Sequence, residues 1–216
     1  MDQEKSSYYV QGKSGILSSL AKVSSHKLLN VLQIIVVIGA AIMIFYLFII
    51  SPHQVDGVSM QPTFCDGDVY FADKITPKMG GYKYGDVVVF KHDEAHDYIK
   101  RVIGVEGDVI RVEGGQVYRN SELLNEKYLP VGRQTLLQPG DQLKEGQNYT
   151  VPQGRYMVFG DNRPNSVDSR NFLAIDPSVN TIKGKVFLMV WPLDRAGFFS
   201  KNQARPMGEC GVSLTN

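Results

Sequence analysis

Cysteine is nearly absent from this 216-residue sequence, which has two, and neither sign of charge is in excess. One pair of thiols is too few for the disulfide scaffold of a small secreted domain. The formal net charge is +1, and the first 50 residues hold four lysines and two acidic residues, which leaves 19 basic and 20 acidic groups in the rest. Because that balance offers no basic surface to a polyanion, we expect no nucleic-acid partner.

Charge is missing altogether from the stretch between Val31 and Ile50. As a helix rising ~1.5 Å per residue, 20 residues span roughly 30 Å, the thickness of the hydrocarbon core of a bilayer. The apolar part of a cleaved signal peptide is only about 7 to 15 residues long, and no small-residue cleavage site follows Ile50. The sequence therefore predicts a retained transmembrane anchor at residues 31–50.

Charges on either side of this anchor predict its orientation. Lys13, Lys22 and Lys27 lie within 20 residues before it, whereas the charged residues among the 20 that follow it are all acidic. Positive charge favours the cytoplasmic side. We predict a single-pass type II protein of the cell membrane, with a cytoplasmic segment at 1–30, an exported domain at 51–200 and a polar tail at 201–216.

Long amphipathic helices are lacking beyond residue 50, where short runs rich in Val, Ile, Tyr and Phe prevail. Gly-Asp pairs open three of these runs, as expected of turns that lead into strands. The predicted strands are 69–71, 87–90, 98–105, 109–110, 156–159 and 185–191. Between about 111 and 154 the runs weaken, which indicates an inserted hairpin or subdomain. The exported part is predicted to be mainly β, a coiled antiparallel sheet or a barrel-like domain.

Cys65 and Cys210 could pair in an exported compartment. Cys210 lies in the polar tail, which has little apolar periodicity and is expected to be disordered. The sequence disfavours the bridge but leaves it open.

Ser59 stands out by position, since only eight residues separate it from the end of the predicted anchor. Those residues, fully extended at ~3.4 Å each, reach under ~30 Å, so Ser59 lies near the lipid surface. Gly57 precedes it and Pro62 follows it, so it lies in an irregular segment whose amides can face a ligand. A lone serine is usually a turn or cap residue, and position alone does not make Ser59 a nucleophile.

Lys100 is the candidate base for Ser59, because no histidine occurs between His53 and His92. In the strand predicted at 98–105, Lys100 and Arg101 point to opposite faces, and both faces also carry apolar residues. Burial disfavours the ammonium form, and lowering a lysine pKa from ~10.4 to between ~7 and ~8 corresponds to about 3 to 5 kcal/mol. A neutral Lys100 could then act as general base. The alternative is a lysine that extends from the strand end to water.

A third polar feature is the segment 160–170, Gly-Asp-Asn-Arg-Pro-Asn-Ser-Val-Asp-Ser-Arg. Its composition suits a solvated surface loop. It also suits a network of hydrogen bonds and ion pairs that fixes a neighbouring side chain.

Together these features resemble those of the type I signal peptidases (leader peptidases) of the bacterial single-anchor type. The resemblance rests on the anchor, Ser-Met-Gln-Pro-Thr at 59–63, Gly-Asp-Val-Val-Val-Phe at 85–90, Lys-Arg-Val-Ile-Gly at 100–104 and the polar segment 160–170, in that order. It covers the anchor and roughly residues 54–110 and 156–193. It implies a serine endopeptidase that removes signal peptides from exported preproteins and needs no metal or other cofactor.

The resemblance also assigns roles to residues. It implies that Ser59 is the nucleophile and Lys100 the general base of a Ser/Lys dyad. Ser166 is similar in position to a serine that orients the lysine, and the supporting network is implied to consist of Asp168 and Arg170, with Arg101 as an ion-pair partner. The implied pockets are shallow apolar sites for small side chains, formed by Val55, Met60, Phe64, Tyr98 and Ile99. The implied partners are exported preproteins, membrane lipid and, nearby, the protein-export machinery.

One departure from the pattern concerns the oxyanion hole. Some members of the family carry a serine two residues before the nucleophile, where this chain has Gly57. The Ser59 amide remains as one donor, and the Gly57 amide or a water could supply the second. Loss of one donor costs on the order of a hundredfold in rate.

Four other hypotheses remain open at this point. His92 and His96 could bind the metal of a hydrolase, but Asp93 stands where the helical zinc motif has Glu. Cys65 could serve a thiol transpeptidase, although no His and Arg surround it in a known pattern. The chain could also be a dedicated peptidase for a few clients such as pilins, or an anchored assembly factor without catalysis.

Overall fold

The computed structural model describes residues 27–44, 50–75, 79–91, 97–176, 182–201 and 210. The chain divides into two compact units, one ending at Leu47 and the other starting at Phe48. The first contains a helix from Lys27 to Ile44, whose apolar side chains are exposed along its whole length. By length and composition, it is the one helix in the described part of the chain that could cross a membrane.

The predicted anchor extends to Ile50, but Ile50 already belongs to strand β1 (Ile50–Gln54). Pro52 explains why a helix cannot continue there. Its ring fixes φ and removes an N–H donor, and it drives the preceding Ser51 toward extended backbone. The apolar run therefore ends in a strand.

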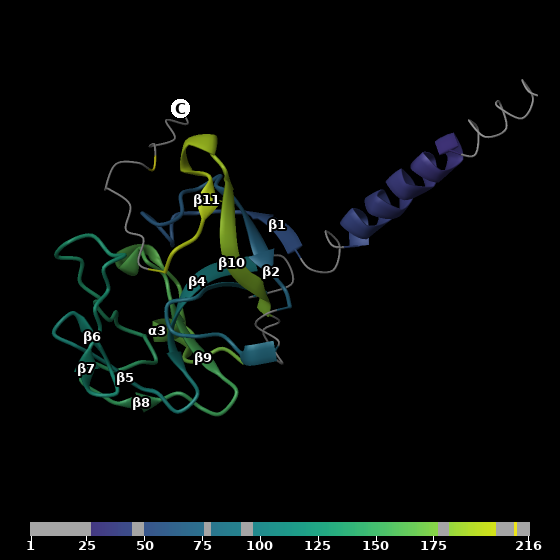
Figure 1. Ribbon diagram of the computed structural model, residues 1–216. Helices are drawn as coiled ribbons and strands as arrows, with labels where there is room; N and C mark the ends of the chain where they lie inside the picture. The colour runs from purple at the N-terminus through teal and green to yellow at the C-terminus, as the bar shows by residue number, and fades with distance from the viewer. Residues whose placement is uncertain are drawn as a thin grey trace, which may run out of the picture. The chain divides into compact units, whose positions relative to one another are not determined.

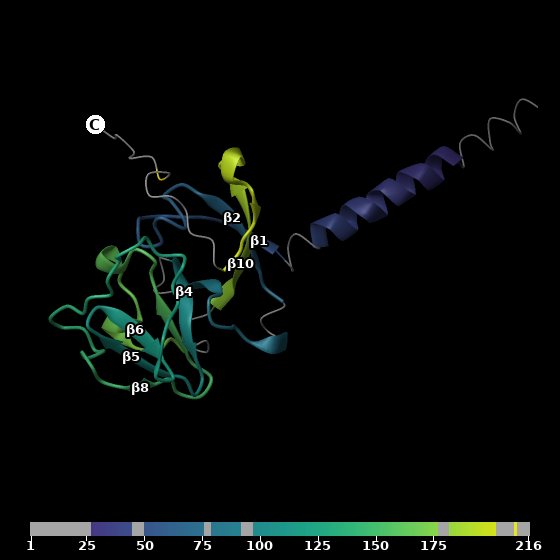
Figure 2. The ribbon, with the colours of Figure 1, turned by 60° about the vertical axis from the view of Figure 1, so that its left-hand side comes forward.

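Two antiparallel sheets form the second unit (Figures 1 and 2). The larger one has the order β1-β2-β10-β3-β4-β9, with β11 also pairing with β10. Its remaining strands are β2 (Val69–Asp73), β3 (Val87–Lys91), β4 (Asp97–Val105), β9 (Tyr156–Phe159), β10 (Ile182–Trp191) and β11 (Gly197–Phe198). The mainly β, antiparallel class predicted from the sequence is confirmed.

The smaller sheet has the order β7-β6-β5-β8. Its strands are β5 (Val109–Glu113), β6 (Gln116–Arg119), β7 (Glu122–Leu123) and β8 (Tyr149–Thr150), in the region where an inserted subdomain was expected. Both figures show β5, β6 and β8 at one end of this unit and β1, β2 and β10 at the other. Helical structure among the described residues of this unit consists of short turns, chiefly η1 (Arg163–Asn165), α3 (Ser169–Phe172) and η2 (Leu193–Arg195).

The three Gly-Asp pairs that precede predicted strands, at 67–68, 85–86 and 107–108, form the same turn each time. Each glycine has a φ between +82° and +84°, a conformation that residues with a Cβ rarely adopt. Each following aspartate is buried and accepts a hydrogen bond from the amide three residues earlier. The donor and acceptor residues are Cys65 and Asp68, Lys83 and Asp86, and Val105 and Asp108. These turns direct the chain into β2, β3 and β5.

Cys65 and Cys210 form a disulfide, with their Cα atoms 5.3 Å apart. This corrects the expectation that disfavoured the bridge. Periodicity could not indicate it, because the covalent bond between two cysteines does not depend on an apolar pattern in the sequence around them.

Candidate active site

Strand β4 brings the predicted base to the predicted nucleophile. Lys100 lies in the middle of β4, where it is paired with Val88 of β3. Its Nζ is 2.7 Å from Ser59 Oγ, and it also donates to the carbonyl of Ile99 at 3.0 Å. Ser59 lies in an irregular turn and is partly exposed. A partly exposed alcohol thus meets an amine that is held by the sheet.

Lys100 is 3% exposed, so its charged form lacks water. Burial lowers its pKa from 10.5 to about 8, while the carboxylates of Asp168 and Asp161 act in the opposite direction. The cause predicted from the sequence, desolvation of a strand lysine, is the largest one here. A substantial fraction of Lys100 is therefore neutral at slightly alkaline pH and able to accept a proton.

Arg101, the next residue on β4, is fully buried. Its guanidinium binds Asp161 through two hydrogen bonds, from Nε to Oδ1 at 2.8 Å and from Nη2 to Oδ2 at 2.6 Å. Tyr128 stacks on the guanidinium at 3.8 Å. Asp161 also accepts a hydrogen bond from Thr63 Oγ1 at 2.5 Å. This ion pair therefore ties β4 to the segment that follows Ser59.

Asn162 holds the segment that contains Ser59 from the other side. Its backbone N–H donates to the carbonyl of Ser59, and its side-chain amide donates to the carbonyl of Val58, both at 3.0 Å. Asp161 and Asn162 are adjacent, so one short segment fixes the backbone on both sides of Ser59 Oγ.

Asp168 and Arg170 form a second buried ion pair, as part of α3. The Arg170 guanidinium donates to Oδ1 and Oδ2 of Asp168, both at 2.9 Å. The same carboxylate caps the start of α3 and accepts a hydrogen bond from the Gly160 amide at 2.9 Å. The ion-pair partner of Arg101 is thus Asp161, while Asp168 belongs to Arg170. Both pairs join the polar segment that the sequence singled out.

Ser166 Oγ is buried and makes no hydrogen bond with the described residues. It lies against Gly160, where an added Cβ would be 2.2 Å from this hydroxyl and 2.5 Å from the Ser59 carbonyl oxygen. Ser166 therefore lies close to the segment that contains Ser59, but the hydrogen bond to Lys100 implied by the resemblance is not formed here.

Four of the five predicted substrate-binding residues pack together. They belong to one core cluster: Val55, Met60, Phe64 and Ile99. Met60 and Phe64 have no exposed surface, so they could contribute only the floor of a pocket. Tyr98 lies on the other face of β4, beside Lys100 Nζ at 4.9 Å from the ring centre. Alternation along the strand separates Tyr98 from Ile99.

The candidate donors to an oxyanion are the backbone amides of Gly57 and Ser59. Gly57 has a φ of +95°, and its amide donates to Asp66 Oδ1 at 2.8 Å. That amide is occupied and is not the second donor in this arrangement. The Ser59 amide makes no hydrogen bond to any described residue, so it can donate to a ligand.

No group of His, Cys, Asp and Glu that could hold a metal ion occurs among the described residues. The His92–His96 motif lies outside them. Cys65, the candidate of the transpeptidase hypothesis, is bonded to Cys210 and offers no thiol.

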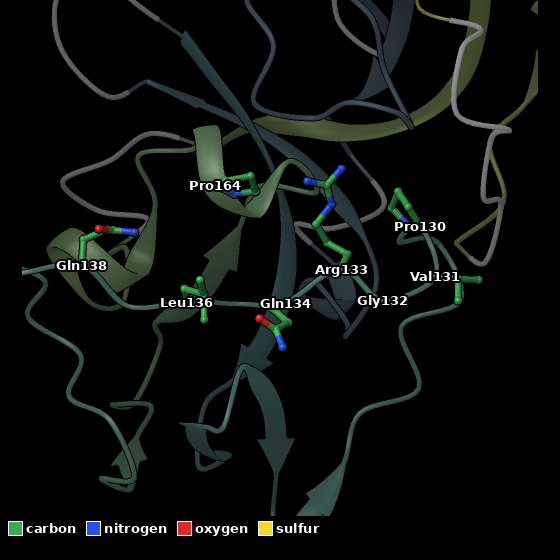
Figure 3. A pocket seen from close by; sticks show the side chains of 8 residues that line it. All are labelled: Pro130, Val131, Gly132, Arg133, Gln134, Leu136, Gln138 and Pro164. Carbon is green, nitrogen blue, oxygen red and sulfur yellow. The ribbon is translucent and has the colours of Figure 1, made fainter.

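Two pockets lie over the inserted subdomain, and neither Ser59 nor Lys100 lines them. One, of about 320 Å³, is lined by a loop at 130–138 and by Pro164 of η1 (Figure 3). The other, of about 600 Å³, shares residues 130–133 with it. Neither is lined by a residue predicted for substrate binding.

Sequence reasoning missed Asp161, Asn162 and Thr63 as individual site residues. The polar segment 160–170 was noted as a whole, but it offers two acids and two arginines that can pair in more than one way. Thr63 was noted only as the last residue of the motif at 59–63, and nothing in the sequence indicates that its hydroxyl binds Asp161. The partners follow from the register of β4 with β9, in which Arg101 faces Phe159.

Comparison with known proteins adds sequence relatives that span the domain. A family model described as "Signal peptidase, peptidase S26" matches residues 28–191. Signal peptidase I U of Bacillus subtilis (strain 168) is 33% identical over 185 residues, which are 85% of this chain and 96% of that protein. Signal peptidase IB of Staphylococcus aureus (strain COL) is 36% identical over 177 residues, 76% of this chain and 91% of that protein.

Among solved structures, a signal peptidase I from Enterococcus faecalis V583 matches with a TM-score of 0.37 and 24% identity. The match covers 48% of this chain and 95% of the other.

Proposed function

The chain belongs to the signal peptidase family, peptidase S26, and we propose that it removes signal peptides through an ester on Ser59 formed with Lys100 as the general base. Membership makes it a serine peptidase of exported preproteins. The identities of nucleophile and base are the proposal, and one observation carries them: Lys100 Nζ lies 2.7 Å from Ser59 Oγ on a lysine that is 3% exposed.

In the proposed reaction, neutral Lys100 takes the proton of Ser59 as Oγ attacks the scissile carbonyl carbon. The Ser59 amide donates to the oxyanion that develops. The Lys100 ammonium then gives its proton to the leaving amine, which releases the mature protein and leaves the signal peptide as an ester. Lys100 next deprotonates a water that attacks the ester carbonyl. As the bond between this carbon and Ser59 Oγ breaks, the Lys100 ammonium returns its proton to Oγ, and the signal peptide leaves as a carboxylic acid. Because each half-reaction starts from neutral Lys100, the rate should rise as pH increases through about 8.

In this proposal, the other polar residues of the site position Ser59 and Lys100. Asp161 and Asn162 hold the backbone around Ser59, and Arg101 fixes Asp161 from the strand that carries Lys100. Asp168 and Arg170 order the segment that contains Ser166. We assign to Ser166 the task of orienting Lys100 once substrate is bound. Reactants held in this way need little reorganisation at the moment of attack.

We further propose that the helix at Lys27–Ile44 anchors the protein in the cell membrane, with the N-terminus in the cytoplasm and the β domain outside. The signal peptide of the substrate is itself apolar and membrane-bound, so both partners meet in a thin layer at the lipid surface, near the export machinery. Protease added to intact spheroplasts should then degrade the β domain and leave an N-terminal epitope protected. Protection of the β domain would contradict this topology.

The test of the dyad uses the full-length protein in detergent with a panel of preproteins. Wild type, Ser59→Ala and Lys100→Ala are compared by the mass of the products. Lys91→Ala is the matched control, because Lys91 is an exposed lysine on the neighbouring strand β3. We expect cleavage by wild type and by the control, and none by the other two variants. Normal cleavage by Lys100→Ala in a folded state would refute the dyad.

A further inference from the structure

The chain continues past the family match, which ends at residue 191, and folds back onto the catalytic side of the domain. We call residues 192–201 together with Cys210 the C-terminal strap. It turns at η2, and β11 then pairs with β10 at Leu188 and Met189 (Figure 1). Beyond β11 the strap touches both elements that hold the dyad.

The first contact is with Arg101, next to Lys100. The carbonyl of Lys201 accepts a hydrogen bond from Arg101 Nη1 at 2.9 Å, and the carbonyl of Gly85 accepts another from the same nitrogen at 3.2 Å. The Lys201 ammonium lies 2.8 Å from Asp86 Oδ1. Arg101 has no exposed surface, so without the strap one of its N–H groups would lack a partner in the protein.

The second contact is with the segment that carries Ser59. The ring of Phe199 packs against Phe64 with 5.2 Å between ring centres, and the Phe64 amide donates to the carbonyl of Met60 at 3.0 Å. Cys65, only six residues after Ser59, forms the disulfide to Cys210. The strap thus reaches the nucleophile segment through both a ring contact and a covalent bond.

Arg195 reinforces the disulfide from within the strap. Its guanidinium donates to Cys65 Sγ at 3.0 Å and to Asp68 Oδ1 at 2.5 Å. Asp68 in turn accepts from the Cys65 amide. Cys65 is therefore the point where the nucleophile segment, the strap and the turn before β2 meet.

We infer that the strap is a positioning element of the catalytic centre and that the Cys65–Cys210 bond keeps it in place, so that full turnover requires the oxidised protein. The strap contacts Arg101 on the Lys100 side and Phe64 and Cys65 on the Ser59 side, and it can therefore hold the dyad in register. Without the disulfide, the part of the strap beyond β11 would be held by the half-buried Phe199 ring, by the backbone hydrogen bonds of Phe199 and Lys201, and by a lysine whose side chain is 46% exposed. This inference rests on the proposed function of Ser59 and Lys100.

Formation of the disulfide needs an oxidant. For an exported domain, this oxidant is the disulfide of a thiol–disulfide oxidoreductase or of a small molecule. The two cysteine thiols lose two protons and two electrons and form one S–S bond. The S–S bond of the oxidant is cleaved to two thiols. The chain would accordingly reach full activity only after export.

The experiment measures kcat and the pH profile of the full-length protein in detergent, with a synthetic peptide that spans a signal-peptide cleavage site. Oxidised wild type is compared with wild type reduced by dithiothreitol, with Cys210→Ser and with the double variant Cys65→Ala/Cys210→Ser. We expect kcat to fall by about tenfold to a hundredfold in all three, as for a small misplacement of reacting groups. The acidic limb of the profile should move to higher pH, because a loosened site leaves Lys100 less desolvated.

Two controls make this result specific. Dithiothreitol should not affect the cysteine variants, and reoxidation of wild type with oxidised glutathione should restore its kcat. Phe199→Ala should lower kcat because the Phe199 ring packs on Phe64, whereas Leu123→Ala should not, since Leu123 is 54% exposed and lies outside the strap. Circular dichroism at the assay temperature would verify that each form is folded.

Unchanged kcat and pH profile in reduced wild type, or a fall in melting temperature alone, would overturn the inference and assign the strap a purely stabilising role. If Cys210→Ser does not fold, reduction of folded wild type still decides. Absence of cleavage by oxidised wild type would instead count against the proposed function.

Discussion

Substitution of Gly160 by alanine tests how rigidly the nucleophile is held. Gly160 follows β9 and lies between Ser166 and the backbone of Ser59. A Cβ at this position would be 2.2 Å from Ser166 Oγ, 2.5 Å from Ser166 Cβ and 2.5 Å from the Ser59 carbonyl oxygen. The hydroxyl can rotate away, but the carbonyl is backbone and can yield only if the segment shifts.

The size of that shift follows from the contact distances. Ordinary contacts of a Cβ start at 3.4 Å, so the Ser59 carbonyl and Gly160 have to separate by about 1 Å. A misplacement of this size costs about a hundredfold in rate. We therefore expect Gly160→Ala to lower kcat about a hundredfold while the protein remains folded.

The assay is cleavage of a synthetic peptide by full-length protein in detergent, with Gly80→Ala as the matched control. Gly80 has open space around its Cβ position and no positive φ, so its variant should keep wild-type kcat. In Gly160→Ala/Ser166→Gly the clash with the serine disappears but that with the Ser59 carbonyl remains, so recovery should be partial at most. A wild-type rate in folded Gly160→Ala would show that the packing around Gly160 does not position Ser59.

Three further predictions concern stability and the remaining polar groups. Lys100→Met should be inactive but more stable at pH 7, by on the order of 3 kcal/mol in denaturant unfolding, because burial lowers the lysine pKa from 10.5 to about 8. Between pH 8 and 10.5 the unfolded chain still carries the Lys100 proton, whereas the folded chain has lost it, so the stability of the wild type rises with pH. The difference in stability between Lys100→Met and wild type should therefore shrink across this range. A difference that stays constant with pH would contradict a buried charge on Lys100. Asp161→Asn should lower the free energy of unfolding by roughly 3 to 5 kcal/mol in a urea titration, because it leaves the buried Arg101 guanidinium without a carboxylate partner. The control Glu122→Gln changes an exposed carboxylate and should alter this free energy by no more than ~0.5 kcal/mol. Ser166→Ala should leave the free energy of unfolding unchanged within ~0.5 kcal/mol, because the Ser166 hydroxyl has no hydrogen-bond partner among the described residues. It should still lower kcat roughly tenfold if this hydroxyl orients Lys100. A loss of stability together with the loss of kcat would assign Ser166 to packing.

Much of the β architecture could be predicted because its signals are local. The Gly-Asp pairs mark turns through a positive φ at glycine and an aspartate that accepts the amide three residues before it. The runs that follow are apolar enough to identify strands. The strand from Ile50 to Gln54 escaped prediction because its first residue continues the apolar run of the helix, and Pro52 was the only local sign of a change.

The site was predictable to the extent that it depends on alternation along one strand. Lys100 and Arg101 were expected to face opposite sides of β4, both of which carry apolar residues, and both side chains are buried. Which carboxylate each arginine binds depends on how β9 and the polar segment pack against β4. Sequence spacing does not contain this information, and so Asp161 was not identified as the partner of Arg101.

The disulfide illustrates the same limit. Cys65 and Cys210 are separated by 145 residues, and the tail around Cys210 shows no apolar pattern. The strap reaches Cys65 because β11 pairs with β10 and Phe199 packs on Phe64, which are contacts between distant parts of the chain. Pairing of two cysteines is allowed by compartment but decided by three-dimensional proximity.

The central claim is that Ser59 forms an ester whose formation requires Lys100. The most direct measurement is the intact mass of the full-length protein, quenched in acid during turnover of a preprotein, followed by digestion to locate the modification. The account predicts an added mass equal to the signal peptide less one water, located on the peptide that contains Ser59 and absent from Ser59→Ala and Lys100→Ala. An adduct on another residue, or an equal yield of adduct in Lys100→Ala, would contradict it.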